Sequence, residues 1–146
     1  MDSYLQKTRR IMKKQLDMVR EFHKACDQPT DREIRGQLPL SELRLRLETL
    51  REEVQEYQDA NVANDTVAIA DALADIQYFL LGTVQCHGMQ DIFEDIFEEV
   101  HRSNMTKVDP SSGEVIRNAS GKILKSSHFI EPNLEPIVKG TQNENH

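Results

Sequence analysis

The sequence contains no tryptophan and is poor in the residues that build sheets and turns. Aromatic residues make up 5% of the 146, and there are 6 glycines and 5 prolines. Strands are enriched in aromatic and β-branched residues, and the turns between them need glycine and proline. This composition therefore favours helices, and the length suits one domain with its own hydrophobic core.

Cysteines and long apolar segments are also scarce. Cys26 and Cys86 are too few for a disulfide framework, and no secretory signal is visible at the N-terminus. The longest apolar run, about residues 72–84, is too short to span a bilayer and is interrupted by Asp75 and Gln77. We expect a reduced, cytoplasmic protein that does not enter a membrane.

An excess of positive charge is absent as well. The net charge of −7 argues against binding to nucleic acid polymers, which requires a basic surface. The charge is uneven, because residues 1–41 carry 9 bases and 6 acids, 42–101 carry 3 and 14, and 102–146 carry 6 and 5. An acidic centre between basic flanks suits divalent cations beside a polyanionic ligand. A solvated acidic helix surface explains the same totals.

Hydrophobic periodicity predicts four helices. The clearest covers about residues 42–60, after a possible N-cap at Ser41, because five apolar residues recur there at steps of three and four. The next helix is apolar on nearly every side, which predicts a central buried helix ended by Gly88. The predicted helices cover about residues 4–26, 42–60, 66–87 and 91–103.

The texture of the sequence changes after Asn104. Turn residues in "DPSSG" and "NASG" flank short β-prone runs, which predicts a small hairpin or irregular arm over 104–134. The polar residues 135–146 predict a flexible tail. The expected fold is all-α, a four-helix bundle in a domain spanning 1–134, with a C-terminal arm.

Carboxylates gather where the chain is otherwise apolar. Glu52, Glu53 and Glu56 lie within one and a half turns of one predicted helix, and Asp71 and Asp75 share a face of the next. Antiparallel packing of the two helices would let these faces converge. Burying unpaired carboxylates costs several kcal/mol each, so a positive partner is needed. Mg²⁺ fits best because it takes oxygen ligands and pairs with phosphates, and Mn²⁺ is an alternative.

Two other interpretations use the same residues. Runs such as "REEVQE" are usually solvated helix surface, although the apolar neighbours of Asp75 leave that residue no polar face. A di-iron bundle would need two Glu-x-x-His motifs on separate helices. The chain has one, Glu98 to His101, and His101 is more simply a helix-end residue.

An ordered set of motifs resembles a known superfamily. "EEVQE" followed by an acidic helix is similar to the EExxE…ExxD signature of the all-α nucleoside triphosphate pyrophosphohydrolases. The blocks "FHKACDQP", "DALADIQYFLLGT", "HRSNMTK", "GKILKSSHF" and "EPNL" resemble its MazG-like branch, which carries a phosphoribosyl-ATP pyrophosphohydrolase-like domain. The resemblance covers most of 19–134. One departure is that Ala72 stands where the ExxD glutamate is expected.

The resemblance implies hydrolysis between the α and β phosphates of a nucleoside triphosphate, such as dUTP or a damaged relative. It implies Glu52, Glu53, Glu56 and Asp75 as metal ligands, with Asp71 replacing the missing glutamate. Glu53 is the first choice for the catalytic residue that orients or deprotonates water. It also implies a homodimer or homotetramer.

Basic and amide residues outside the acidic centre are candidates for substrate binding. Lys and Arg suit phosphate, and Asn can pair with a base or sugar. They are equally explained as surface cations, a helix C-cap and a structural histidine. The candidates are His23, Arg102, Asn104, Lys107, Lys122 and Lys125.

The enzyme hypothesis has two competitors. A non-enzymatic helical interaction module would use the same amphipathic helices to bind a protein partner. A nucleotide sensor would bind the nucleotide without hydrolysing it. The sequence does not name the base or the sugar.

Overall fold

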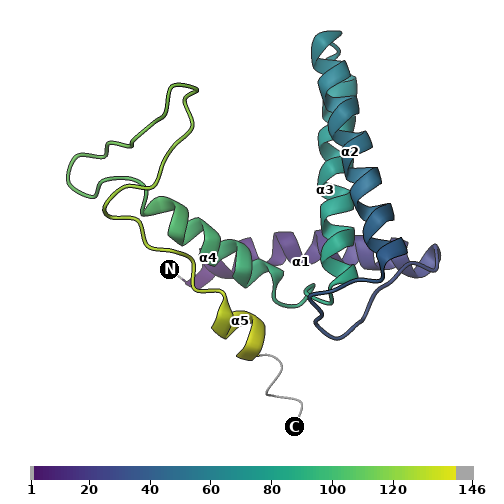
Figure 1. Ribbon diagram of the computed structural model, residues 1–146. Coiled ribbons are helices and arrows are strands. Elements are labelled where there is room, and N and C mark those ends of the chain that lie inside the picture. The colour runs from purple at the N-terminus through teal and green to yellow at the C-terminus, as the bar shows by residue number, and fades with distance from the viewer. Residues whose placement is uncertain (1, 141–146) are drawn as a thin grey trace. The chain divides into compact units, whose positions relative to one another are not determined.

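The protein is all-helical, as the sequence predicts. The computed structural model describes residues 2–140, with side chains from residue 12 onward, so residues 141–146 of the predicted tail lie outside the described residues. Figure 1 shows the elements. Within the described part the helices are α1 (Asp2–Ala25), α2 (Leu40–Val62), α3 (Thr66–Cys86), α4 (Phe93–Met105) and α5 (Glu135–Gly140).

The chain divides into two compact units, Met1–Asp91 and Ile92–His146. In the first unit α2 and α3 form an antiparallel pair, and α1 crosses near the C-terminal end of α3 (Figure 1). The second unit contains α4, the arm and α5. The predicted domain over 1–134 stays a prediction.

Helix ends in the first unit follow a shared pattern. Asp27, Asn64 and Gly88 follow α1, α2 and α3 in the left-handed region, with φ of 56°, 53° and 68°. After α3, the Gly88 and Met89 N–H groups donate to carbonyls of the last turn at 3.0 and 3.1 Å. A Cβ at Gly88 would lie 2.4 Å from a carbonyl oxygen of Glu33, so glycine is required here and ends the helix as predicted.

The start of α2 differs from the prediction. The N-cap is Pro39 rather than Ser41, and no side chain caps the helix. Pro39 has φ of −52° and its carbonyl accepts the first helical hydrogen bond from Leu43, at 3.0 Å. In contrast, Asp65 caps α3 through its side chain, which accepts from the Ala68 N–H at 3.0 Å.

The prediction that the third helix is a central buried helix is wrong for its N-terminal half. Its C-terminal half carries most of its buried residues, including Leu81, Val84, Gln85 and Cys86, whereas Val67 at the other end is 81% exposed. The reason is that α2 lies along α3 but α1 reaches only its C-terminal end. Length and a mean hydropathy of 1.4 would let Thr66–Cys86 span a membrane, which is weak evidence by itself.

Gln85 joins three parts of the first unit. Its side chain is fully buried, and its Nε2 donates to the Leu16 carbonyl of α1 at 3.1 Å. Its Oε1 accepts from the Thr30 hydroxyl at 2.7 Å. One buried amide therefore fixes α3 to α1 and to the loop that follows α1.

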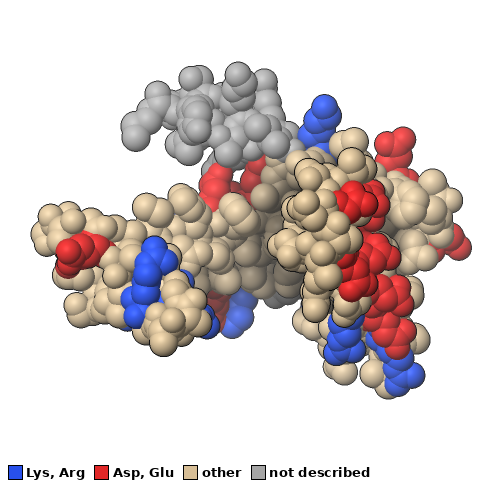
Figure 2. Space-filling view, turned by 90° about the horizontal axis from the view of Figure 1, so that it is seen from above, with Lys and Arg blue, Asp and Glu red and all other residues tan. Residues whose placement is uncertain are grey.

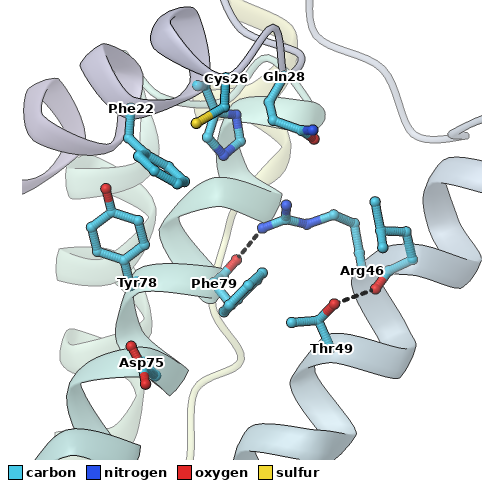
Figure 3. Close-up of a pocket in the computed structure, with 10 residues that line it drawn as sticks. Phe22, Cys26, Gln28, Arg46, Thr49, Asp75, Tyr78 and Phe79 are labelled. Carbon is cyan, nitrogen blue, oxygen red and sulfur yellow. Dashed lines mark hydrogen bonds between the residues drawn. The ribbon is translucent and has the colours of Figure 1, made fainter.

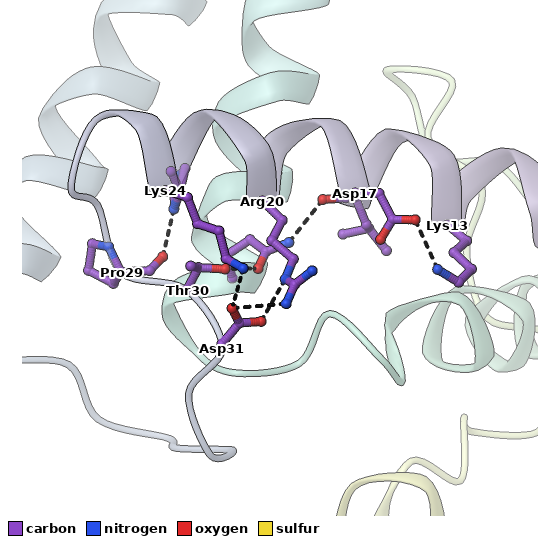
Figure 4. A network of polar contacts seen from close by, with 10 residues as sticks. Lys13, Asp17, Arg20, Lys24, Pro29, Thr30 and Asp31 are labelled. Atoms are coloured by element: carbon purple, nitrogen blue, oxygen red, sulfur yellow. Dashed lines mark hydrogen bonds and ion pairs between the residues drawn. The ribbon is translucent and has the colours of Figure 1, made fainter.

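Ion pairs hold the same loop against α1 (Figure 4). Arg20 Nε lies 2.6 Å from the Asp31 carboxylate and Lys24 Nζ lies 3.3 Å from it. The hydrogen bond from Arg20 lowers the pKa of Asp31. Further along, Arg32 donates to both carboxylate oxygens of Glu42 at 2.7 and 3.1 Å, which attaches the loop to α2.

In the second unit the arm folds back on α4. Ser103 donates to the Ile130 carbonyl at 2.7 Å, and the Ile130 N–H donates to the Thr106 hydroxyl at 2.9 Å. Of the two predicted forms, a small hairpin or an irregular arm, the structure shows the irregular arm, with one isolated antiparallel bridge between Arg117 and Ile123. Residues 135–140 form helix α5, where the sequence predicts the start of a tail.

We expect Gln85→Ala to lower the free energy of unfolding by roughly 2–4 kcal/mol, because it removes the two hydrogen bonds that join α3 to α1 and to the loop and leaves a cavity at a fully buried position. Chemical denaturation monitored by circular dichroism measures this. Gln77→Ala is the matched control, since Gln77 is exposed on the same helix. An equal loss in both variants would contradict the role given to Gln85.

Candidate metal and nucleotide site

Three carboxylates from α2 and α3 meet in the first unit. Glu53 and Glu56 stand one turn apart on α2, and Asp75 faces them from α3. One carboxylate oxygen from each residue lies within 4.8 Å of the others. Figure 2 shows acidic side chains gathered along this helix pair. Carboxylates this close together repel one another when all of them are ionised.

Glu53 has an unsatisfied oxygen in this cluster. Its Oε2 is buried and has no hydrogen-bond partner among the described residues. Burial raises the pKa of Glu53, and the nearby Asp75, Glu56, Asp71 and Glu52 charges raise it further. Hard oxygen donors with an unpaired buried oxygen are a suitable ligand set for Mg²⁺ or Mn²⁺.

The five predicted metal ligands therefore separate into two groups. Glu53, Glu56 and Asp75 come together, and Glu53 and Asp75 are half-buried. Glu52 and Asp71 are exposed and stand outside the three-residue cluster, although both charges reach Glu53.

A pocket of about 400 Å³ adjoins the cluster. Figure 3 shows Asp75 at one end and Cys26 and Gln28 at the other. The Phe22 and Tyr78 rings meet edge to face at 5.5 Å between centroids. The lining comes from α1, the loop after it, α2 and α3, namely Phe22, His23, Cys26, Gln28, Leu45, Arg46, Thr49, Asp75, Tyr78 and Phe79.

Arg46 is a pocket residue that the sequence reasoning missed. It is 5% exposed, its Nη2 donates to the Phe79 carbonyl at 2.8 Å and its Nε donates to the Thr83 hydroxyl at 3.2 Å. Burial lowers the pKa of Arg46. A signal was available, because Arg46 is spaced three residues after Leu43 and four before Leu50, on the apolar stripe of α2.

His23 lines the pocket beside Arg46, as a buried side chain that is 3% exposed. Its Nδ1 lies 2.6 Å from the Pro29 carbonyl oxygen. Burial lowers the pKa of His23 and the Arg46 charge lowers it further. A carbonyl can only accept, so the neutral ring carries its proton on Nδ1 and presents Nε2 as an acceptor.

The other predicted substrate-binding residues belong to the second unit. Arg102 pairs with Glu99, its Nη2 lying 2.6 Å from the carboxylate, which lowers the pKa of Glu99 to about 2. Lys107 and Lys125 lie over the Phe129 ring at 5.7 and 4.8 Å, and Lys125 also pairs with Glu131. Asn104 and Lys122 are exposed.

Comparison with known families decides the assignment. The phosphoribosyl-ATP pyrophosphohydrolase family model matches residues 19–104, which include the whole of α2 and α3. The chain belongs to the phosphoribosyl-ATP pyrophosphohydrolase family. A search of curated proteins finds no match. The family places the protein among the MazG-like all-α nucleotide pyrophosphohydrolases, hydrolases that act on phosphoric anhydrides, and so confirms the predicted superfamily and enzyme class.

The raised pKa of Glu53 gives a prediction about stability without metal. The folded state holds the Glu53 proton more tightly than the unfolded state, so stability falls as pH rises from about 4.5 through the folded pKa. We expect Glu53→Gln to remove this loss, so that its melting temperature at pH 7 in a chelator is higher than that of the wild type. Thermal melts at several pH values measure the difference.

With an added divalent ion, the wild type should melt at a higher temperature than Glu53→Gln. At about 100 times its Kd an ion stabilises the wild type by about 2.7 kcal/mol, and the variant should gain much less. Glu48→Gln, an exposed glutamate on α2, is the control and should behave like the wild type. If Glu53→Gln melts below the wild type at pH 7 in a chelator, the ionised Glu53 does not destabilise the metal-free protein, and the prediction is wrong.

Proposed function

We propose that the protein is a Mg²⁺-dependent nucleoside triphosphate pyrophosphohydrolase, with Mn²⁺ as an acceptable substitute. It cleaves the bond between the α and β phosphates of a dUTP-like or non-standard deoxynucleoside triphosphate, and releases the monophosphate and pyrophosphate. The observation that supports this most directly is the unpaired Glu53 oxygen in a three-carboxylate cluster beside an apolar pocket.

Glu53, Glu56 and Asp75 would hold the metal. Once bound, Mg²⁺ neutralises phosphate charge and lowers the pKa of a water molecule that it holds. Glu52 and Asp71 add negative charge around the cluster and would act through water, because both are exposed and outside it.

Glu53 is the proposed catalytic base. Its Oε2 is an acceptor without a partner among the described residues, so it can take a hydrogen bond from the attacking water.

The pocket would receive the sugar and base. Its aromatic side chains offer apolar faces, and its few polar groups can fix the orientation of a ligand. Asp75 belongs both to the cluster and to the pocket lining. Phosphates bound at the cluster would therefore lead directly into the pocket. Contacts to phosphate from Arg102, Lys107, Lys122 and Lys125, and to the base or sugar from Asn104, stay predictions.

We also propose a cytoplasmic homodimer or homotetramer. Large apolar side chains on both helices of the pair stay in contact with water in the single chain, including Leu47, Val54 and Leu73 at 41%, 52% and 50% exposure. Many large apolar side chains exposed on one helix pair favour an interface with another chain. A second copy of the chain would cover it.

Pyrophosphate release from a panel of deoxynucleoside triphosphates with Mg²⁺ tests the activity. We expect Glu53→Gln and Asp75→Asn to lower kcat/KM at least about 100-fold, since each removes a charge from the metal site and the first also removes the base. Glu48→Gln should retain full activity. Turnover of no nucleotide by the folded wild type, or equal turnover by Glu53→Gln, would refute the proposal.

A further inference from the structure

The carboxylate cluster and Arg46 are separated by the same number of residues on both helices of the pair. Going from Glu53 to Arg46 covers seven residues of α2, and going from Asp75 to Gly82 covers seven residues of α3 in the opposite chain direction. Seven helical residues rise about 10 Å. Phosphates held at the carboxylates would thus leave room for a sugar, and would place the base near Arg46.

Arg46 has hydrogen-bond donors to spare at that point. Its Nε and Nη2 are occupied by Thr83 and Phe79, but Nη1 makes no hydrogen bond to any residue that the structure describes. Figure 3 shows this second terminal nitrogen directed away from the Phe79 carbonyl and toward the end of the pocket where Gln28 lies. Arginine has no acceptor atoms, so only an acceptor can satisfy Nη1.

His23 supplies the complementary acceptor beside it. A Cβ built on Gly82 would lie 2.4 Å from Arg46 Nη2 and 2.8 Å from His23 Nε2. Both groups therefore approach one point on α3, and glycine leaves the space for them. The hydrogen bond to Pro29 fixes the His23 proton on Nδ1, so Nε2 accepts.

Resting on the proposed function, we propose that Arg46 and His23 select a base with a carbonyl oxygen next to a ring N–H. Arg46 donates to the carbonyl and His23 accepts from the N–H. Uracil, thymine, guanine and hypoxanthine present this edge. Cytosine and adenine present an amino group next to a ring acceptor, which opposes both protein groups and leaves them unpaired.

The aromatic side chains fit this assignment because they are indifferent to the base edge. Phe22, Tyr78 and Phe79 can stack on any base. The Thr49 hydroxyl donates its proton to the Leu45 carbonyl at 2.9 Å, so it does not donate to the base. Gln28 also lines the pocket, but its amide carries both a donor and an acceptor and can turn to suit either kind of base edge. The discrimination thus comes from the Arg46 and His23 pair. A pair of specific hydrogen bonds to a base edge separates right from wrong bases by about 10- to 100-fold.

Wild-type kcat/KM values for dUTP, dTTP and dGTP against dCTP and dATP, with Mg²⁺, test the inference. We expect the first group to exceed the second by about 10- to 100-fold. If no nucleotide releases pyrophosphate, the proposed function fails. If dCTP or dATP is hydrolysed as well as dUTP, this inference is overturned and the proposed function stands.

A variant series assigns the effect to Arg46. Arg46→Lys keeps the positive charge but removes the planar set of donors, so the ratio of dUTP to dCTP should fall to within about threefold. Arg44→Lys is the matched control, because Arg44 is exposed on the same helix. A folded, active Arg46→Lys variant with the wild-type ratio would overturn the assignment.

A binding measurement keeps the inference testable if Arg46→Lys does not fold. The affinities of the wild-type protein for deoxyuridine monophosphate, its N3-methyl derivative and deoxycytidine monophosphate are compared. The N3-methyl compound lacks the N–H that His23 would accept, and we expect it to bind at least about tenfold more weakly than the parent. Equal binding of all three would overturn the proposed selection.

Discussion

Repulsion among Glu53, Glu56 and Asp75 is the constraint on which the site depends. Nothing inside the cluster offsets it, since the Glu53 Oε2 has no partner among the described residues and the pKa of Glu53 is raised. Such an arrangement persists only if other contacts hold α2 against α3. Such contacts lie further along the pair, where the buried Arg46 of α2 donates to the Phe79 carbonyl and to the Thr83 hydroxyl of α3.

One antiparallel register serves both ends of the pocket. It sets Glu53 opposite Asp75, and seven residues away it sets Arg46 against Phe79, Gly82 and Thr83. A shift by one residue would turn the carboxylates and the arginine away from their partners together, since neighbouring residues on a helix point about 100° apart. The proposed metal site and the proposed base site are therefore set by the same helix contact.

The sequence predicted the helices and the acidic cluster because both are encoded in local spacing. The apolar residues spaced three and four apart, Leu43, Leu47, Leu50, Val54 and Tyr57, identified α2. Asp75 stood out because its neighbours are apolar. What covers a helix is a tertiary property, so the same periodicity overestimated the burial of α3. The approach of Arg46 and His23 over Gly82 joins three distant segments. The place of Arg46 on the apolar stripe marks it as unusual, but local spacing does not show what it meets.

The structure explains why Ala72 replaces the glutamate of the ExxD pattern. Ala72, which stands where a glutamate is expected, is 2% exposed, so a longer charged side chain there would force its way into packed surroundings. Asp71, on the adjoining position, is exposed and acts on Glu53 only through its charge. A cluster of three carboxylates leaves more coordination positions open than one of four. Mg²⁺, which keeps several waters, can fill such positions with water and substrate phosphate.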